Sequence, residues 1–365
     1  MEEPTITKKP IYQRPKKASF RKLRSEVNRI VKNSPKRNQL KIKAVLFPLL
    51  YIAAYSILLI YGKNPLVFYS SYFLLGILLI LIFLNLIHDA VHGVIFKKRW
   101  LNDFCVHFFD FLGANSYVWK IRHIKLHHTY PNIMNWDSDF EQSPLVRVFP
   151  QSEFKKFHKY QYIYLPFLYP LYLFNWLLVR DFKDFFKKDV LVRKVAEIPK
   201  KEYFKLFFFK AVFLGYLIFI PKFVLDLPWL NVISGFVVMV FTASFISLLV
   251  LLSPHANINS DFPQPDGKGK MPYNWMEHQL RCTNDISNDN FFIRFFMGSF
   301  NYHIAHHLFP DIAHVYYPQI TPVIEKFAKE NGLEYRKMSL LESLRGHYRL
   351  LKANAFNENI FEETM

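Results

Sequence analysis

Long apolar runs separated by short polar turns dominate the first 250 residues of the chain. Residues 44–61, 66–87 and 230–252 carry no charge and are 18, 22 and 23 residues long, which is enough for a helix to cross the hydrocarbon core of a bilayer. Residues 206–220 are shorter and contain Lys210, whose long side chain can reach the interface. The pattern predicts an all-α integral membrane protein with four transmembrane helices arranged as two hairpins.

The composition agrees with a membrane protein. Of the 365 residues, 51% are hydrophobic and 18% are aromatic, yet the formal net charge is +18. Basic residues flank the apolar runs instead of following one another along a soluble domain, so we expect a basic membrane-proximal face and no nucleic-acid partner. Two cysteines, Cys105 and Cys282, make no disulfide framework.

The basic N-terminal arm sets the predicted orientation. Fourteen Lys or Arg residues precede Ala44, whereas the turns after the first and third runs offer little beyond Lys63 and Lys222. Positively charged flanks stay in the cytoplasm, so we expect both termini there. The predicted organisation is a cytoplasmic arm over residues 1–43, a membrane domain with a helical cytoplasmic cap over residues 44–334, and a cytoplasmic tail over residues 335–365.

Histidines gather in three clusters beside the apolar runs. Each cluster contains a pair four residues apart, and that spacing places both imidazoles on one face of a helix. A further histidine follows Pro254 at the end of the last run. The nine candidate metal ligands are His88, His92, His123, His127, His128, His255, His303, His306 and His307.

So many imidazoles on one predicted side of a membrane indicate a metal centre. Neutral imidazole suits iron, zinc and copper. Because a zinc site usually takes four ligands, eight or nine nitrogens suit two metal ions that keep positions open for water or oxygen. We expect Asp89, Asp137, Asp139 and Asn301 to orient the ligands from outside the metal positions. For Asp137 an ordinary surface or capping role is the alternative.

Residues 160–179 could span the bilayer by length, but they are aromatic and interrupted by Pro166 and Pro170. If they crossed it, His255 and His303 would lie on the side opposite His88 and could share no metal centre with it. We therefore expect residues 160–179 to be interfacial or re-entrant.

The residues around the histidine clusters resemble the motifs of the membrane fatty acid desaturases, in the acyl-lipid or linoleoyl-CoA desaturase-like branch that includes the front-end enzymes. The resemblance covers residues 43–334. Many front-end enzymes place Gln where His303 stands, which leaves front-end regiochemistry open. The matching motifs and residues are His88-Asp89-x-x-His92; Trp119; His123-x-x-x-His127-His128-Thr129-Tyr130; Asn132; Asp137-x-Asp139; and Asn301-Tyr302-His303-x-x-His306-His307-Leu308-Phe309-Pro310.

The resemblance implies a centre of two iron ions that uses O2 to introduce a cis double bond into a fatty acyl chain, carried by a lipid or by CoA. The metal ions carry out the cleavage of the unactivated C–H bonds, so no catalytic residue beyond the metal ligands is expected. Many relatives also carry a fused cytochrome b5 domain with a His-Pro-Gly-Gly motif, which does not occur here. Electrons are therefore expected from a separate donor, of the ferredoxin or cytochrome b5 type with its reductase. Trp119, Trp136 and Trp275 are candidates to line the acyl slot, and ordinary interfacial aromatics are the alternative for each.

Two other functions stay open at this point. A membrane di-iron hydroxylase of a fatty acid, sterol or carotenoid would share the histidine clusters. A histidine-rich metal transporter would instead need a site near the bilayer midplane, and the apolar runs contain no histidine. The abundance of Lys, Ile, Phe and Asn suggests an AT-rich bacterial genome, and hence a place in the bacterial inner membrane.

Overall fold

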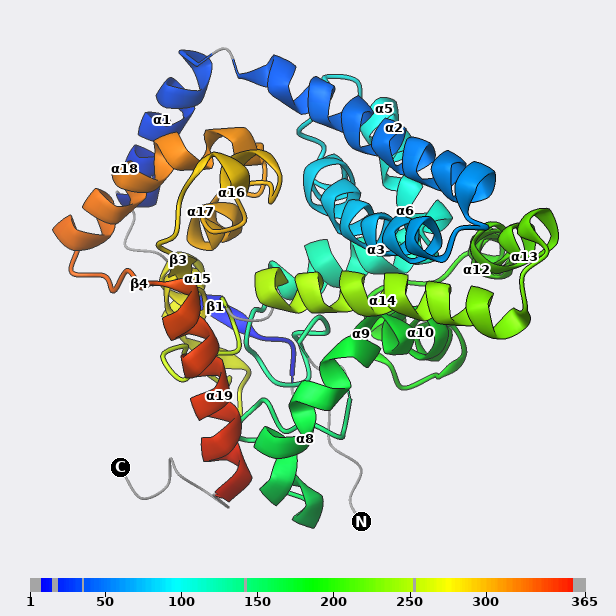
Figure 1. Ribbon diagram of the computed structural model, residues 1–365. Coiled ribbons are helices and arrows are strands. Elements are labelled where there is room, and N and C mark those ends of the chain that lie inside the picture. The colour runs from blue at the N-terminus through cyan, green and yellow to red at the C-terminus, as the bar shows by residue number, and fades with distance from the viewer. Residues whose placement is uncertain (1–7, 15–18, 35, 141–142, 252–253, 357–365) are drawn as a thin grey trace.

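A bundle of long helices joined to a helical cap forms the fold (Figure 1). The computed structural model describes residues 8–14, 19–34, 36–140, 143–251 and 254–356. Among these residues the strands are short and form two parallel pairs, β1 (Ile11–Gln13) with β2 (Lys270–Asn274) and β3 (Asp285–Ile286) with β4 (Lys337–Met338). The predicted helical membrane fold with a histidine-rich cluster is confirmed.

Five helical stretches are long and apolar enough to cross a membrane. They are Asn38–Tyr61, Pro65–Val91, Lys156–Phe186, Lys200–Leu225 and Trp229–Val250. Four of them contain or overlap the predicted runs, and Lys156–Phe186 contains the stretch that we expect to be interfacial or re-entrant. The count of four spans thus stays a prediction, and residue 252, where the last predicted run ends, lies outside the described residues.

Helix α3 (Pro65–Ile82) is the centre of the bundle. It packs between α2 (Arg37–Tyr61) and α14 (Trp229–Leu251) (Figure 1). The start of α3 follows from the sequence, because the side chain of Asn64 accepts hydrogen bonds from two backbone N–H groups of the first turn and Pro65 occupies the first helical position.

The last turns of the second predicted span deliver the first histidine cluster. Helix α3 passes without a break into the π-helical segment η1 (Phe83–Ile87) and then into α4 (His88–Val91). A π-helical turn contains one residue more than an α-helical turn, and such turns are frequent at functional sites. His88 is therefore held on a rigid, buried element at the end of the bundle.

Lys210 is placed differently from our expectation that it reaches the interface. It lies on α12 (Lys200–Leu214), is buried, and its Nζ donates to Asp181 Oδ2 at 2.8 Å and to the carbonyl of Gly113. The reason is the carboxylate at the start of α10 (Asp181–Phe186), since a charge pair offsets part of the cost of burying the ammonium group.

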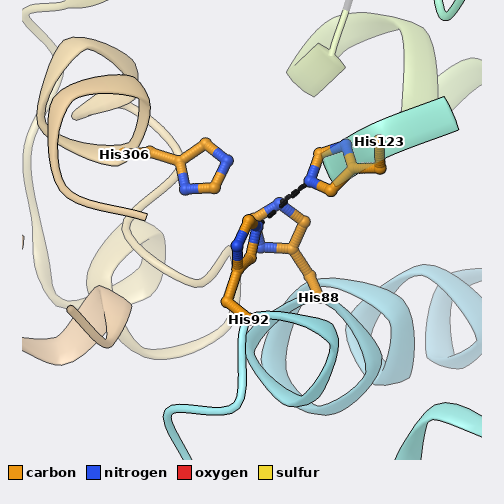
Figure 2. A group of neighbouring side chains, drawn as sticks. All are labelled: His88, His92, His123 and His306. Atoms are coloured by element: carbon orange, nitrogen blue, oxygen red, sulfur yellow. Dashed lines mark hydrogen bonds between the residues drawn. The ribbon is translucent and has the colours of Figure 1, made fainter. Parts of the chain in front are cut away.

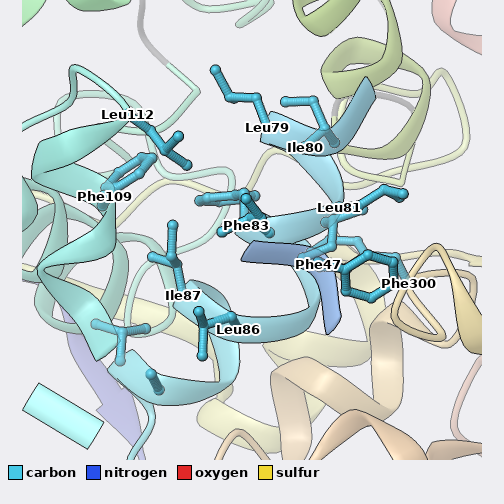
Figure 3. Close-up of a cluster of buried hydrophobic side chains, with 14 of the residues drawn as sticks. Phe47, Leu79, Ile80, Leu81, Phe83, Leu86, Ile87, Phe109, Leu112 and Phe300 are labelled. Atoms are coloured by element: carbon cyan, nitrogen blue, oxygen red, sulfur yellow. The ribbon is translucent and has the colours of Figure 1, made fainter. Parts of the chain in front are cut away.

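One continuous cluster of buried apolar side chains joins the bundle to the cap. It draws residues from α2, α3, η1, α6 (Phe108–Phe111) and the segment before the third histidine cluster. Because Ile87 directly precedes His88 and Phe300 lies three residues before His303, this core reaches the base of two histidine clusters. Figure 3 labels Phe47, Leu79, Ile80, Leu81, Phe83, Leu86, Ile87, Phe109, Leu112 and Phe300.

The described parts of the N-terminal arm contact the cap. The hydroxyl of Tyr12 donates to the carbonyl of Thr129 at 2.6 Å, next to the second histidine cluster. Helix α1 (Ser19–Lys32) packs on α18 (Tyr317–Glu330). The predicted boundary at residue 43 falls inside α2.

The other helices of the described residues connect the bundle and build the cap. They are α5 (Arg99–Val106), α7 (Ser116–Lys120), η2 (Ile121–His127), η3 (Lys156–Tyr160), α8 (Gln161–Leu168), η4 (Tyr169–Leu171), α9 (Tyr172–Phe174), η5 (Asn175–Arg180), α11 (Leu191–Val195), η6 (Gly215–Phe219), α13 (Ile220–Leu225), α15 (Trp275–Cys282), α16 (Phe291–Phe295), α17 (His303–Leu308), η7 (His314–Tyr316) and α19 (Leu340–Phe356).

Candidate metal centre

The nine candidate histidines converge at the junction of bundle and cap. They come from α4 and the residue after it, from η2 and the residue after it, from the segment after α14, and from α17. Two sets of four place one ring nitrogen each within 4.8 Å of one another. The "His88 group" is His88, His92, His123 and His306, drawn in Figure 2, and the "His127 group" is His127, His255, His303 and His307.

The spacing between ring nitrogens in both groups is that of ligands around an ion. In the His88 group, the Nε2 atom of His123 lies 3.2 Å from the Nε2 atoms of both His88 and His92 (Figure 2). In the His127 group, the Nε2 atom of His255 lies 2.9 Å from that of His303 and 3.0 Å from that of His307. Two nitrogens bound to one ion at about 2.1 Å and a right angle lie about 3 Å apart, so the histidines fit metal binding.

His128 lies between the two groups. Its Nε2 is 3.1 Å from the Nε2 of His123 in the His88 group. One of its nitrogens also lies within 4.8 Å of nitrogens of His306 and His307, which belong to different groups. The ninth histidine is thus placed to complete the coordination of either metal position.

The second histidine cluster contributes one ring to each group. The four-residue spacing predicts both imidazoles on one helical face, and of these two rings His123 belongs to the His88 group and His127 to the His127 group. Both rings come from the π-helical segment η2, where the N–H of His128 bonds to the carbonyl of His123, five residues back. The two rings still stack, with centroids 5.8 Å apart, as the four-residue spacing predicts.

Hydrogen-bond acceptors stand behind most of the rings. The Nδ1 of His127 lies 3.0 Å from Asp137 Oδ1, and the Nδ1 of His123 lies 3.4 Å from Asp139 Oδ2. An N–H at Nδ1 donates to the carboxylate and leaves Nε2 as the lone-pair nitrogen for a metal. Both carboxylates therefore lie where we expected them.

Two predicted supports contact other partners. Asp89 accepts from the Nδ1 of His314 at 2.8 Å instead of from a candidate ligand, because its side chain leaves the helix about 100° around from that of His88. The Nζ of Lys43 donates to the opposite nitrogen of the same His314 ring at 3.0 Å. Asn301 donates to the carbonyl of Asn288 at 3.1 Å.

Three supports were not foreseen from the sequence. The Nδ1 of His307 lies 3.0 Å from Gln279 Oε1, that of His255 lies 3.0 Å from the carbonyl of Cys282, and that of His306 lies 3.1 Å from the hydroxyl of Tyr317. These contacts join residues 11 to 28 positions apart, so no local pattern indicates them.

Electrostatics keeps most of the cluster neutral. Burial, together with the neighbouring imidazoles, lowers the pKa of His307 and of His255 well below the ordinary value. Burial also acts to lower the pKa of His127, but the carboxylates of Asp137 and Asp139 outweigh it and the pKa is raised. A neutral imidazole offers the lone pair that a metal ion needs.

A cavity of about 70 Å³ opens beside the histidines. His88, His123, His127, His255 and His303 border it on one side, and Trp119 stacks on His123 in its wall. A second, apolar cavity of about 30 Å³ shares Phe83 and Trp176 with it and is otherwise lined by Leu79, Ile80, Phe109, Leu112, Ala114, Leu173 and Leu177. An apolar cavity therefore lies next to the cavity beside the histidines.

The other two tryptophans proposed for this slot lie elsewhere. Trp136 packs edge-on against Tyr130 with ring centroids 5.2 Å apart, and Trp275 packs against Phe20 at 5.9 Å. Neither borders the two cavities described above.

Fold and site together define a class, a multi-helix membrane protein with a buried polyhistidine site that fits a metal. The family model of the fatty acid desaturases matches residues 63–339, well over half of the chain. The chain belongs to the fatty acid desaturase family and is an oxidoreductase of unsaturated fatty acid biosynthesis.

The chain is similar to curated desaturases from several organisms. It is 30% identical over 274 residues to the sn-1 linoleoyl-lipid 6-desaturase of Arthrospira platensis, covering 75% of this chain and 74% of that protein. It is 30% identical over 271 residues to the protein of the same description from Synechocystis sp., covering 74% and 75%. It is 29% identical over 317 residues to the acyl-lipid (8-3)-desaturase of Physcomitrium patens, covering 84% and 65%.

Proposed function

We propose that this protein introduces a cis double bond into a fatty acyl chain with O2, at two iron ions held by the nine histidines. The observation that carries the proposal is the division of the histidines into two groups, each with four nitrogens within 4.8 Å. When bound, the two irons supply the oxidising power for an unactivated C–H bond, which side-chain acid–base chemistry cannot supply. Each turnover takes O2, two electrons and two protons, removes two hydrogens from the acyl chain and releases two waters.

The residues of the chain position the reactants. The histidines hold the metals through Nε2, and Asp137, Gln279 and Tyr317 fix three of the ring orientations from the Nδ1 side. The apolar cavity receives the part of the acyl chain beyond the reacting carbons, and its Leu and Phe walls exclude water. Trp119 holds the ring of His123 by stacking at 5.1 Å.

We propose an acyl lipid as the substrate. Two of the relatives named above are described as linoleoyl-lipid desaturases and a third as an acyl-lipid desaturase. Acyl-CoA is the alternative carrier. A separate electron donor, of the ferredoxin or cytochrome b5 type with its reductase, supplies the two electrons.

The convergence of the histidines supports four spans with both termini in the cytoplasm. His88 lies in the last turn of the second apolar helix, Pro65–Val91, so it lies on the side of the N-terminus. If Lys156–Phe186 crossed the bilayer, three crossings would separate His88 from His255, and the two would lie on opposite faces. Both belong to one site with nitrogen contacts bridging the groups, so we propose that Lys156–Phe186 lies at the interface of the inner membrane.

Lipid analysis of an expressing host tests the proposal. Fatty acids from cells that express the protein together with an electron donor are resolved by gas chromatography, and the double bond is located by mass spectrometry. A new unsaturated fatty acid, absent with a His127→Ala variant, is the expected result. Hydroxylated products without new double bonds would establish a hydroxylase instead, and metal flux across vesicles without any lipid change would establish a transporter.

A further inference from the structure

The two histidine groups differ in the acceptors behind their rings. In the His127 group, three of the four Nδ1 atoms face strong acceptors, each at 3.0 Å: the carboxylate of Asp137, the amide oxygen of Gln279 and the backbone carbonyl of Cys282. Carbonyl and carboxylate oxygens pull on the N–H and make the opposite nitrogen more basic. The metal position of this group is thus surrounded by strengthened donors.

The His88 group has weaker support. The Nδ1 of His306 faces the hydroxyl of Tyr317 at 3.1 Å, and that of His123 faces Asp139 at 3.4 Å, a longer and weaker hydrogen bond than those of the His127 group. Among the described residues we find no hydrogen bond to the Nδ1 of His88 or of His92. The hydroxyl of Tyr317 is an uncharged acceptor and therefore a weaker partner for an N–H than a carboxylate.

The supports of the His127 group are themselves fixed. Asp137 is fully buried and also accepts from the backbone N–H of Asn132 at 2.9 Å and of Asp139 at 3.2 Å. The amide of Gln279 donates to the carbonyl of His128 at 3.3 Å, which presents its oxygen to His307. Neither side chain has to reorganise when a metal binds, so little of the binding free energy is lost in ordering them.

We infer that the two metal positions are unequal: the His127 group holds its ion more tightly, and the His88 group releases its ion first. Asp137 and Gln279 are the positioning residues of the tight position, and Tyr317 is that of the weak one. Loss of one such hydrogen-bond partner typically costs 10- to 100-fold in metal affinity, so a difference of about that size between the positions is expected. The inference rests on the proposed function for the presence of two ions and for their identity as iron.

Release of iron to a chelator tests the inference without any measurement of activity. Purified full-length protein loaded with ferrous iron is mixed with excess ferrozine, and the coloured complex is followed in time. Two phases of equal amplitude, about 10- to 100-fold apart in rate, are expected. A single phase that accounts for both irons would overturn the inference.

Matched variants assign the phases. Asp137→Asn and, independently, Gln279→Met should accelerate the slow phase by about 10-fold or more and leave the fast phase unchanged. Tyr317→Phe should accelerate only the fast phase. The control is Asp266→Asn. Asp266 is exposed, and its carboxylate accepts hydrogen bonds from the backbone N–H groups of Lys268 and Lys270 in a turn, so this variant should change neither phase.

The outcomes separate the inference from the proposed function. Acceleration of the fast phase by Asp137→Asn and Gln279→Met, or of the slow phase by Tyr317→Phe, would overturn the assignment of the positions. If the wild-type protein bound no iron while remaining monodisperse, the proposed function would fail as well. If it bound two irons that left at one rate, only the inequality would fail.

Discussion

This protein has two buried regions that are held together by different interactions. One is the seam between α3 and α14, and the other is the histidine centre. The seam is close-packed through small residues: a Cβ at Gly76 would lie 2.5 Å from the carbonyl oxygen of Met239, and one at Gly235 would lie 2.6 Å from the ring of Tyr72. The seam is held by close packing of apolar groups. The centre is built of polar rings, and those of His127, His306 and His307 depend on hydrogen-bond partners from other parts of the chain.

This difference in packing and polarity implies that the seam controls the stability of the fold and the centre controls the metal chemistry. Close packing at the seam contributes to the stability of the bundle through dispersion and excluded volume. The centre gains little stability from burying nine imidazoles, because each polar ring must be satisfied to offset its desolvation. We therefore expect substitutions at the centre to abolish function with the fold retained, and substitutions at the seam to weaken the fold with the metal chemistry retained.

Removing a ligand should have the largest effect. His127→Ala and His306→Ala each delete one nitrogen from a different group. Product formation should fall by more than about 100-fold, since even loss of an outer hydrogen-bond partner costs 10- to 100-fold, and iron should fall below two per chain. Gas chromatography and elemental analysis measure both. His107→Asn, at a half-exposed histidine outside both groups, is the control, and full activity in either alanine variant would contradict the ligand assignment.

Filling the apolar cavity should alter the substrate range next. Ala114→Phe places a ring in the space that we assign to the acyl chain. Conversion of long chains should fall on the order of ten-fold, equivalent to about 1.4 kcal/mol, while iron content stays at the wild-type value. Competition between acyl chains of different length measures the effect. An unchanged product profile at unchanged expression would remove the cavity from the substrate path.

Crowding the seam should reduce stability without touching the metals. Gly235→Ala pushes a methyl group against Tyr72 and Phe68, and overpacking of this kind costs about 1–3 kcal/mol. Thermal unfolding in detergent should show a lower midpoint, and the iron content of the folded fraction should stay unchanged. Gly215→Ala is the matched control, because no heavy atom lies within 4 Å of its added Cβ. Equal midpoints for the two variants would contradict close packing at the seam.

Changes on the outer surface of the bundle should have the smallest effect. Phe204 is 71% exposed on α12, a position that we assign to lipid contact. Phe204→Leu should change the unfolding free energy by less than about 0.5 kcal/mol and leave the lipid profile as in the wild type. A loss of stability as large as that of Gly235→Ala would mean that this face packs against protein.

The sequence predicted the bundle well and the centre in part. Apolar runs without charge have one stable solution in lipid, the helix, so their positions could be found by inspection. The nine histidines could be found because clusters of imidazole beside apolar runs are rare without a function. The carboxylates Asp137 and Asp139 could be found because they follow the second cluster by only a few residues.

The remaining features depend on tertiary structure. The division of His123 and His127 between two groups depends on where other segments place their histidines, which the spacing of residues does not reveal. The pairing of Lys210 with Asp181 joins residues 29 positions apart. Asp89 lies inside the first histidine cluster, so we expected it to orient a metal ligand, but helical geometry turns its side chain toward His314.

The central claim is that the histidines hold two metal ions, one in each group. Diffraction from crystals of the iron-loaded protein, measured on both sides of the iron absorption edge, tests it most directly. Two anomalous peaks are predicted, one bounded by His88, His92, His123 and His306 and the other by His127, His255, His303 and His307. A single peak, or peaks away from these nitrogens, would contradict the account.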